Sequence, residues 1–250
     1  MKKNVLILGM ARSGTSLAAS IFANQGYFVA DTNSDKLQTA DEYNPSGYWE
    51  SSQLMGYNKE ILAATGFEHD NTWFHESITS KQIDRIKNLN PTKDHVSFVQ
   101  KFNKHSPWLW KDPRLCYTLE YWWPLLKHTN TRVLHVTRSS DEIYKSFLRV
   151  SKDWHTSISM DEETIKNRIK EHVDSAKKIL LENNIPHVSF NYSDYTSKPD
   201  EITGKLNHFF NINLSSSDLG FKKKTNRDTY SISAWQRILG LIKHFIPTKK

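Results

Sequence analysis

Short apolar runs alternate with longer amphipathic segments along the chain. Residues 5–8 form a continuous apolar run, and comparable runs follow at residues 108–110, 132–137 and 186–191. Such runs are typical of strands covered on both faces, because a half-exposed strand would alternate polar and apolar residues. The segments between the runs have the length of helices. The pattern therefore predicts a three-layer α/β fold, with a mostly parallel central sheet flanked by helices.

Helical spacing of apolar residues marks several segments between the predicted strands, at residues 17–26, after Asp141 and from Asp161 onward. Residues 31–107 are less regular, with helices expected near residues 53–65 and 80–88, and we interpret this region as a substrate-facing insertion. The length predicts one domain over residues 1–250, with residues 231–250 as a C-terminal helix and tail. That helix is expected to dock on the core; peripheral contact with a membrane or with a partner is the alternative.

The composition narrows the class of protein. The 250 residues are 37% hydrophobic and contain no apolar run of about 20 residues, the length that crosses a bilayer. The single cysteine, Cys116, excludes an internal disulfide and fits a reducing compartment, so we expect a cytoplasmic protein. The net charge of +7 suggests an anionic ligand, membrane or nucleic acid, although the basic residues are diffuse and partly terminal.

The segment GMARSGTS, from Gly9 to Ser16, directly follows the first predicted strand. It fits the Walker pattern G-x-x-x-x-G-K-S/T at both glycines, but Thr15 stands where the lysine belongs. A glycine loop that opens a helix presents backbone N–H groups and the positive end of the helix dipole, which suit a phosphate or a similar anion. Arg12 adds a positive charge, and Thr15 and Ser16 add hydroxyls. A tight turn without a ligand is the alternative.

With Arg12-Ser13-Gly14-Thr15-Ser16 in this loop, the chain resembles the sulfotransferases that use 3′-phosphoadenosine 5′-phosphosulfate (PAPS). Three further segments occur in the family's order, and the resemblance covers roughly residues 4–212. It implies a P-loop NTPase-like sulfotransferase fold, PAPS as co-substrate, adenosine 3′,5′-bisphosphate as product and no metal. The loop residues would hold the 5′-phosphosulfate: Arg12, Ser13, Gly14, Thr15 and Ser16.

The first further segment is NPSGYWES, residues 44–51, which resembles a segment of bacterial members related to carbohydrate sulfotransferases. Its carboxylate, Glu50, is the candidate general base, with Glu42 in reserve. A base takes the proton of the acceptor hydroxyl as the new bond forms, and such groups contribute about 10²–10⁴-fold. The alternative for Glu50 is an N-cap or first-turn carboxylate of the helix that follows.

The second segment is WKDPRL, residues 110–115, at the end of a predicted strand. It resembles the K-D-P element of tyrosylprotein and bacterial sulfotransferases, which implies that Lys111 stabilises charge developing on the transferring and leaving groups. Arg114 is a weaker candidate for the same role. The alternative is a structural ion pair between Asp112 and Arg114, with Pro113 starting the next helix.

The third segment is HVTRSSDEIYKSF, residues 135–147. In the family, an arginine at a strand end and a serine about eight residues later bind the 3′-phosphate of the nucleotide, and Arg138 and Ser146 have this spacing. Asp141 is expected to cap the helix that carries Ser146. The family often has Arg-x-Pro here, whereas Ser139 and Ser140 follow Arg138 in this chain. A surface arginine at a strand end is the alternative.

Together, these segments predict in-line transfer of a sulfonate from PAPS to an acceptor hydroxyl, which we expect on a carbohydrate or glycolipid. Lys111 and Arg12 would stabilise the developing charge, and Glu50 would deprotonate the acceptor. We expect no nucleic-acid partner. Two other classes stay open: a P-loop-type kinase using ATP, and a non-catalytic protein that binds anionic polymers. The kinase predicts a lysine at Thr15, and the binder predicts a clustered basic stripe.

Overall fold

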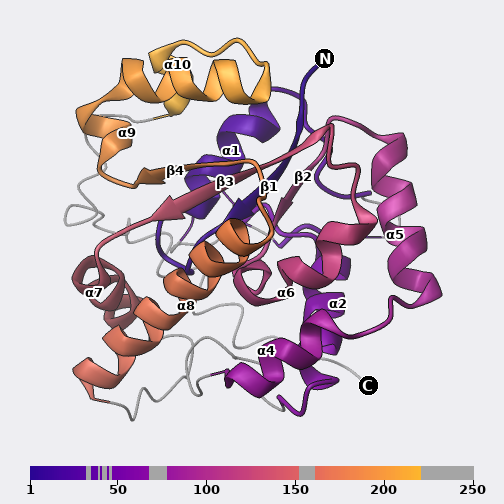
Figure 1. Ribbon diagram of the computed structural model, residues 1–250. Coiled ribbons are helices and arrows are strands. Elements are labelled where there is room, and N and C mark those ends of the chain that lie inside the picture. Colours follow the sequence, from indigo (N-terminus) through magenta and orange to yellow (C-terminus); the bar gives the residue numbers. More distant parts are fainter. Residues whose placement is uncertain are drawn as a thin grey trace, which may run out of the picture. The chain divides into compact units, whose positions relative to one another are not determined.

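Four parallel strands form the sheet of the computed structural model, in the order β2-β1-β3-β4 (Figure 1). The strands are β1 (Asn4–Leu8), β2 (Leu109–Lys111), β3 (Thr131–Thr137) and β4 (His187–Asn191). All four predicted strands are thus confirmed to within about one residue at each end. The structure describes residues 1–31, 35–38, 40, 44, 47–67, 78–151 and 161–220.

The helices lie between the strands, as the apolar spacing predicted. They are α1 (Thr15–Asn24), α2 (Ser52–Ala63), α4 (Ser80–Lys87), α5 (Lys93–Lys104), α6 (Leu115–Trp122), α7 (Ser140–Ser151), α8 (Glu162–Glu182), α9 (Asp194–Ser197) and α10 (Pro199–Phe210), with 3-10 turns at Trp123–Leu125 and Ser216–Leu219. The helices expected near residues 53–65 and 80–88 are confirmed as α2 and α4, whereas α5 was not predicted. The expectation that Pro113 starts a helix is wrong, because α6 begins two residues later at Leu115.

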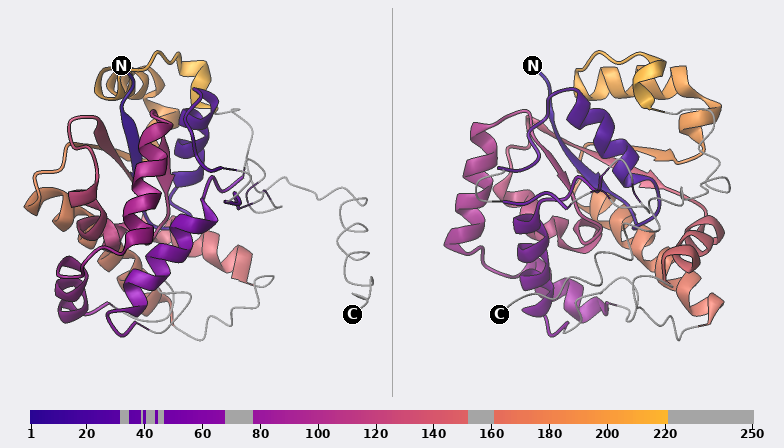
Figure 2. Two further views of the ribbon diagram at one scale, coloured as in Figure 1. Left: turned by 90° about the vertical axis from the view of Figure 1, so that its right-hand side faces the viewer. Right: turned by 180° about the vertical axis from the view of Figure 1, so that it is seen from behind.

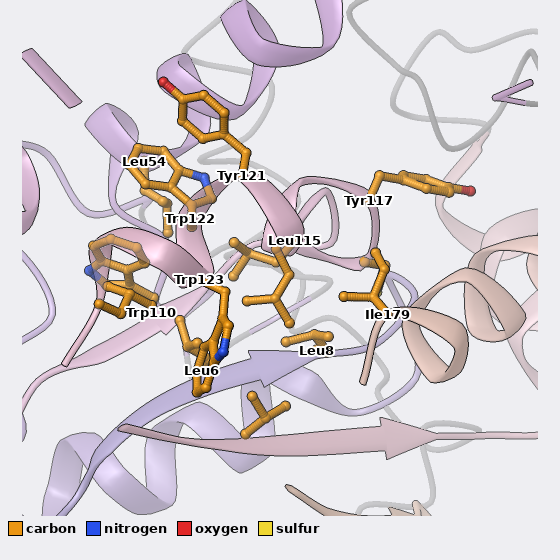
Figure 3. Close-up of a cluster of buried hydrophobic side chains, with 14 of the residues drawn as sticks. Leu6, Leu8, Leu54, Trp110, Leu115, Tyr117, Tyr121, Trp122, Trp123 and Ile179 are labelled. Carbon is orange, nitrogen blue, oxygen red and sulfur yellow. The ribbon is translucent and has the colours of Figure 1, made fainter. Parts of the chain in front are cut away.

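The sheet is covered on both faces, which confirms the predicted three-layer α/β fold. Figure 1 shows α6 and α8 in front of the sheet, and the view from behind in Figure 2 shows α1 in front of it. On the first face, Leu6 and Leu8 of β1 lie in one buried cluster with Leu115 of α6 and Ile179 of α8 (Figure 3). On the second face, α1 also packs on α10, where the rings of Phe22 and Phe210 are 5.0 Å apart.

The region between α1 and β2 contributes to the same core. Side chains of α2 and α5, including Leu54 and Phe98, join the cluster that contains Trp110 and Trp122. The rings of Phe98 and Trp110 stack with centroids 5.2 Å apart. The described part of residues 31–107 is therefore built into the main core, and its substrate-facing role stays a prediction.

Residues 1–220 form one compact unit. None of the helices that the structure describes has the length and apolar character needed to cross a bilayer. The predicted C-terminal helix at residues 231–250 and the reserve base Glu42 lie outside the described residues. One domain over the whole chain therefore stays a prediction.

Candidate functional site

The loop from Gly9 to Ser16 leaves the centre of the sheet in a backbone conformation that requires its glycines. Gly9 and Gly14 have φ angles of 153° and 103°. A Cβ atom on Gly9 would lie 2.5 Å from the carbonyl oxygen of Val136, and one on Gly14 would lie 2.2 Å from the ring of Tyr192. Arg12 also has a left-handed φ, of 68°. The loop is thus held tightly between the end of β3 and the residue after β4.

This loop leads into α1 without a side-chain cap. Gly14 occupies the N-cap, where it makes no side-chain capping hydrogen bond, and the first turn contains no acidic residue. The hydroxyl of Ser13, a residue that is only 1% exposed, has no hydrogen-bond partner among the described residues. Unsatisfied N–H groups at a helix N-terminus, together with a buried free hydroxyl, form a site suited to an anion.

Arg12, Arg138 and Ser146, which lie far apart in the sequence, meet beside this loop. Nε of Arg12 donates to Oγ of Ser146 over 3.0 Å, and Nη1 of Arg138 donates to the carbonyl oxygen of Arg12 over 3.3 Å. The guanidinium of Arg138 lies over the ring of Tyr192, 4.5 Å from its centroid. Nη2 of Arg138 also donates to Glu142 over 3.2 Å. Two cations and a hydroxyl thus converge at the carboxyl end of β3.

The predicted cap of α7 is wrong. Ser139 occupies the capping position, since its Oγ accepts the backbone N–H of Glu142 over 3.4 Å. Asp141 lies in the first turn of α7 instead, where its carboxylate pairs with Lys166 of α8. The predicted cap is two residues too late in the sequence, because both serine and aspartate are favourable N-cap residues.

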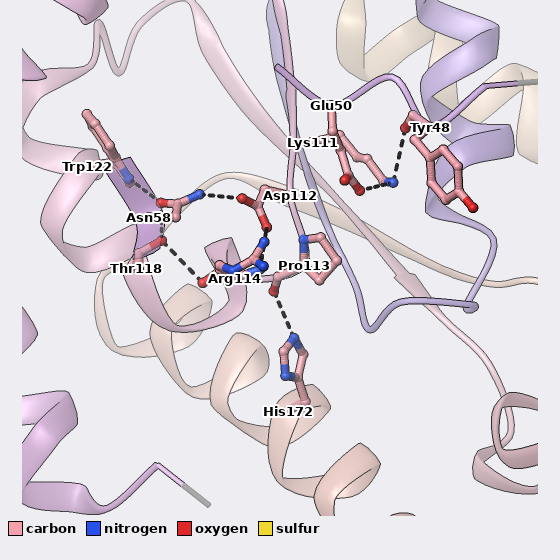
Figure 4. A network of polar contacts seen from close by, with 10 residues as sticks. All are labelled: Tyr48, Glu50, Asn58, Lys111, Asp112, Pro113, Arg114, Thr118, Trp122 and His172. Carbon is pink, nitrogen blue, oxygen red and sulfur yellow. Dashed lines mark hydrogen bonds and ion pairs between the residues drawn. The ribbon is translucent and has the colours of Figure 1, made fainter. Parts of the chain in front are cut away.

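Lys111 and Glu50 form a buried pair on the other side of the loop (Figure 4). The ammonium of Lys111 contacts the Glu50 carboxylate and donates over 3.1 Å to Oγ of Ser16 and over 3.1 Å to the carbonyl oxygen of Tyr48. The two side chains are 4% and 8% exposed. Burial raises the pKa of the Glu50 carboxyl, and the adjacent Lys111 opposes that rise. The end of β2 thus supplies to the loop a lysine that the loop itself lacks.

The structural alternative for Glu50 is wrong. The N-cap of α2 is Ser51, whose Oγ accepts the N–H of Leu54 over 3.1 Å. The Asp35 carboxylate lies at the same helix end, where it accepts the N–H of Gln53 over 3.0 Å and the hydroxyls of both Ser51 and Ser52. Asp35 and Ser51 accept the N–H groups at the N-terminus of α2. The Glu50 carboxylate does not cap this helix and pairs with Lys111 instead.

The ion pair between Asp112 and Arg114, which the structural alternative expected, is confirmed. Oδ1 of the fully buried Asp112 accepts both the backbone N–H of Arg114, over 2.9 Å, and its Nη1, over 3.0 Å. Oδ2 accepts from Nδ2 of Asn58 over 3.0 Å. Both carboxylate oxygens of Asp112 are thus engaged by groups of the chain itself.

Two residues of the site were not assigned from the sequence. Tyr192 packs on Gly14, and the guanidinium of Arg138 lies over its ring. The sequence feature that could have indicated its role is its position directly after a predicted strand. Asp35 caps α2 from 16 to 18 residues away, over a separation that no local pattern encodes. Among the described residues, no cluster of three or more His, Cys, Asp and Glu side chains could hold a metal ion.

A scan of protein-family models and a search of curated proteins find no match to this chain. Solved structures show similarity at low identity. The chain is similar to the sulfotransferase domain from the Synechococcus PCC 7002 olefin synthase, with a TM-score of 0.47 and 14% identity over 88% of this chain and 77% of that one. It is also similar to a sulfotransferase from Mycobacterium tuberculosis, with a TM-score of 0.45 and 12% identity over 87% of this chain and 70% of that one.

Proposed function

We propose that this protein transfers a sulfonate group from PAPS to the hydroxyl of an acceptor. The observation that carries the proposal is the uncapped N-terminus of α1, with a buried lysine on one side of its loop and two arginines on the other. PAPS has a phosphosulfate at one end and a 3′-phosphate at the other. These residues fit such a molecule, because they offer free N–H groups, a free hydroxyl at Ser13 and separate cations.

The loop residues would hold the phosphosulfate end. Gly14 lets the loop keep a φ of 103° against the Tyr192 ring, Ser13 has a buried hydroxyl free to donate, and Ser16 already receives a hydrogen bond from Lys111. Thr15 is the first residue of α1, a position whose backbone N–H has no acceptor within the helix. Arg138 would bind the 3′-phosphate, with Ser146 fixing Arg12 next to it.

Two residues would act on the transfer itself. Glu50 would accept the proton of the acceptor hydroxyl as the acceptor oxygen bonds to sulfur. Lys111, with Arg12, would stabilise the negative charge that develops, and both are in place before reaction. When bound, PAPS supplies the sulfonate, whose bond to the 5′-phosphate oxygen breaks and leaves its electron pair on adenosine 3′,5′-bisphosphate.

The acceptor would be a carbohydrate or a glycolipid. The support is the resemblance of NPSGYWES, which contains Glu50, to the corresponding segment of carbohydrate-type sulfotransferases. The net charge of +7 suits an acceptor that is itself an anionic glycan. A cytoplasmic location is proposed with it, on the single buried cysteine, Cys116.

A kinase that uses ATP is the main competing function. In kinases of the P-loop class, a carboxylate at the end of a neighbouring strand binds Mg²⁺. Asp112 has that position after β2, but its oxygens accept from Arg114 and Asn58, and the residue is 0% exposed. These contacts favour sulfonate transfer over phosphoryl transfer.

Thermal unfolding with two ligands tests the proposal. Adenosine 3′,5′-bisphosphate is expected to raise the melting temperature, whereas ATP with Mg²⁺ is not, because a ligand stabilises the fold that binds it. Stabilisation by ATP with Mg²⁺ alone would contradict the proposal. If an anionic polysaccharide stabilises the protein and neither nucleotide does, a polymer-binding function is indicated instead.

Two variants separate binding from transfer. Arg138→Ala is expected to weaken binding of the bisphosphate, whereas Glu50→Ala should leave that binding unchanged and reduce transfer by about 10²–10⁴-fold. Because Glu50 must be deprotonated to act as base and burial raises its pKa, wild-type transfer should fall on acidification at a pH above the ordinary carboxyl value of 4.5. Equal losses of bisphosphate binding in the two variants would remove Glu50 from the role of base.

A further inference from the structure

Asn58, in the middle of α2, is the centre of a buried polar network that joins three elements. Its Nδ2 donates to Asp112 after β2 over 3.0 Å. Its Oδ1 accepts from Oγ1 of Thr118 and from Nε1 of Trp122, both in α6 and both over 2.8 Å. Figure 4 shows these side chains converging on Asn58. All four residues are 0% exposed, so each hydrogen bond is made where water cannot replace it.

The network is connected along the chain to both members of the buried pair. Asp112 directly follows Lys111, and Asn58 lies in α2, the helix that begins two residues after Glu50. Two side-chain contacts therefore close a ring: Glu50 to Lys111 at one end of α2, and Asn58 to Asp112 further along it. If the second contact is lost, we expect α2 to shift along the end of β2 and Glu50 to move with it.

We propose that Asn58 is a positioning residue that sets the placement of Glu50 against Lys111. This role rests on the proposed function, since it concerns the residues that would remove the acceptor's proton and stabilise the developing charge. Asn58 suits it because an amide is both donor and acceptor. It satisfies an acceptor on Asp112 and two donors on α6 at the same time, which no carboxylate or apolar side chain can do.

A reciprocal exchange tests this role. N58D places two carboxylates against each other, and D112N places two amides there with their donors opposed, so each single variant loses the hydrogen bond. The double variant N58D/D112N restores the full pattern. The amide at position 112 accepts from Arg114 and donates to the carboxylate at position 58, which accepts from Thr118 and Trp122. The net charge is also that of the wild type.

We expect N58D to lower kcat for sulfonate transfer at least tenfold, and the exchange to return it to within about threefold of wild type. Binding of adenosine 3′,5′-bisphosphate should change less than twofold in either, because its proposed contacts lie outside the network. The matched control is N207D in α10, where the amide binds both backbone groups of Leu214 at 2.7 and 2.9 Å. It should lower the melting temperature and leave kcat unchanged.

Other outcomes would overturn the role. If N58D keeps the wild-type kcat at a temperature where both are folded, Asn58 does not position the pair. If the exchange restores the melting temperature but not kcat, the hydrogen-bond pattern is not what matters. Should N58D not fold, N58S takes its place with the same expectations. A wild-type protein that transfers no sulfonate overturns the proposed function and this role with it. An active wild type with an unaffected N58D variant overturns the role of Asn58 alone, so the two failures are distinguishable.

Discussion

Two helices begin beside Lys111, and their N-termini differ. The N-cap of α1 is Gly14, which has no side chain, and the first turn of α1 contains no acidic residue. The N-cap of α2 is Ser51, and the N–H groups of its first turn donate to both the Ser51 hydroxyl and the Asp35 carboxylate. A helix N-terminus attracts negative charge in either case. At α2 the negative charge comes from the Asp35 carboxylate, and at α1 the first turn contains no acidic residue, which is where we propose that the phosphosulfate binds.

Lys111 connects the two helix ends. It donates to Ser16 in the first turn of α1 and pairs with Glu50, the residue before the cap of α2. At the filled end of α2, the Glu50 carboxylate lies against this lysine, and we propose that the open end of α1 presents the lysine to a ligand. Four substitutions test this division of roles, taken from the largest expected effect to the smallest.

Lys111→Met should lower sulfonate transfer by about 10²–10³-fold, because it removes the one buried cation shared by the two helix ends. Steady-state kinetics measure the loss. The control is Lys205→Met, which removes an exposed lysine paired with Glu201 over 2.6 Å and should leave turnover unchanged. A change below threefold in Lys111→Met would show that the open end of α1 does not depend on this lysine.

Gly14→Ala should weaken binding of adenosine 3′,5′-bisphosphate at least tenfold, since the added Cβ would lie 2.2 Å from the Tyr192 ring at a φ of 103°. Such strain is worth about 1–3 kcal/mol, and about 1.4 kcal/mol corresponds to a tenfold change in affinity. Calorimetry measures the affinity. Gly204→Ala is the matched control and should bind as wild type, because an added Cβ there would meet nothing within 4 Å among the described residues beyond its own stretch of α10. Unchanged binding in Gly14→Ala would place the anion elsewhere.

Asp35→Ala should reduce the free energy of unfolding by about 1–2 kcal/mol, because it removes the anion from the N-terminus of α2. Affinity for the bisphosphate should not change. Denaturant unfolding and calorimetry give the two values, and Asp161→Ala, at the N-cap of α8, is expected to behave alike. If Asp35→Ala instead weakened bisphosphate binding, the two helix ends would not have separate roles.

Ser13→Ala should slightly raise the stability of the free protein and slightly lower its affinity for the bisphosphate. Removing a buried hydroxyl that has no partner among the described residues should raise the stability of the free protein by at most about 1 kcal/mol. Affinity for the bisphosphate should fall about threefold to tenfold, since a hydrogen bond to a charged ligand is lost. Thermal unfolding with and without ligand shows both. A loss of stability without ligand would mean that the hydroxyl serves the fold.

The order of strands and helices could be predicted because each strand has the same kind of local sequence pattern. Buried parallel strands have continuous apolar runs, so all four were found, and the loop after β1 contained its own signature. The irregular pattern of residues 31–107 gave no prediction of α5. This helix nevertheless has a cap at Thr92 and helical spacing of its buried residues, which are His95, Phe98, Val99 and Phe102. The predicted cap Asp141 and the predicted helix start Pro113 are each two residues from the observed positions, as is usual at helix ends.

The sheet order predicts that residues which follow strands meet at one edge, whereas Glu50 and Ser146 were assigned only through the resemblance of their segments. Lys111 and Arg138 come directly at the ends of β2 and β3, so parallel strands bring them to one edge of the sheet. The contact between Glu50 and Lys111 joins residues 61 apart, and the Asn58 to Asp112 bond joins residues 54 apart. Such pairings depend on how α2 packs against α6, which no short window of sequence encodes.

The strand order also sets a distance. β1 separates β2, where Lys111 is anchored, from β3, where Arg138 is anchored, and two strand spacings amount to about 10 Å. An ion as small as inorganic sulfate can lie beside one of these anchor points, whereas a molecule with negative groups at both ends can engage the two together. We therefore expect the site to favour a ligand by the separation of its negative charges as well as by their sign.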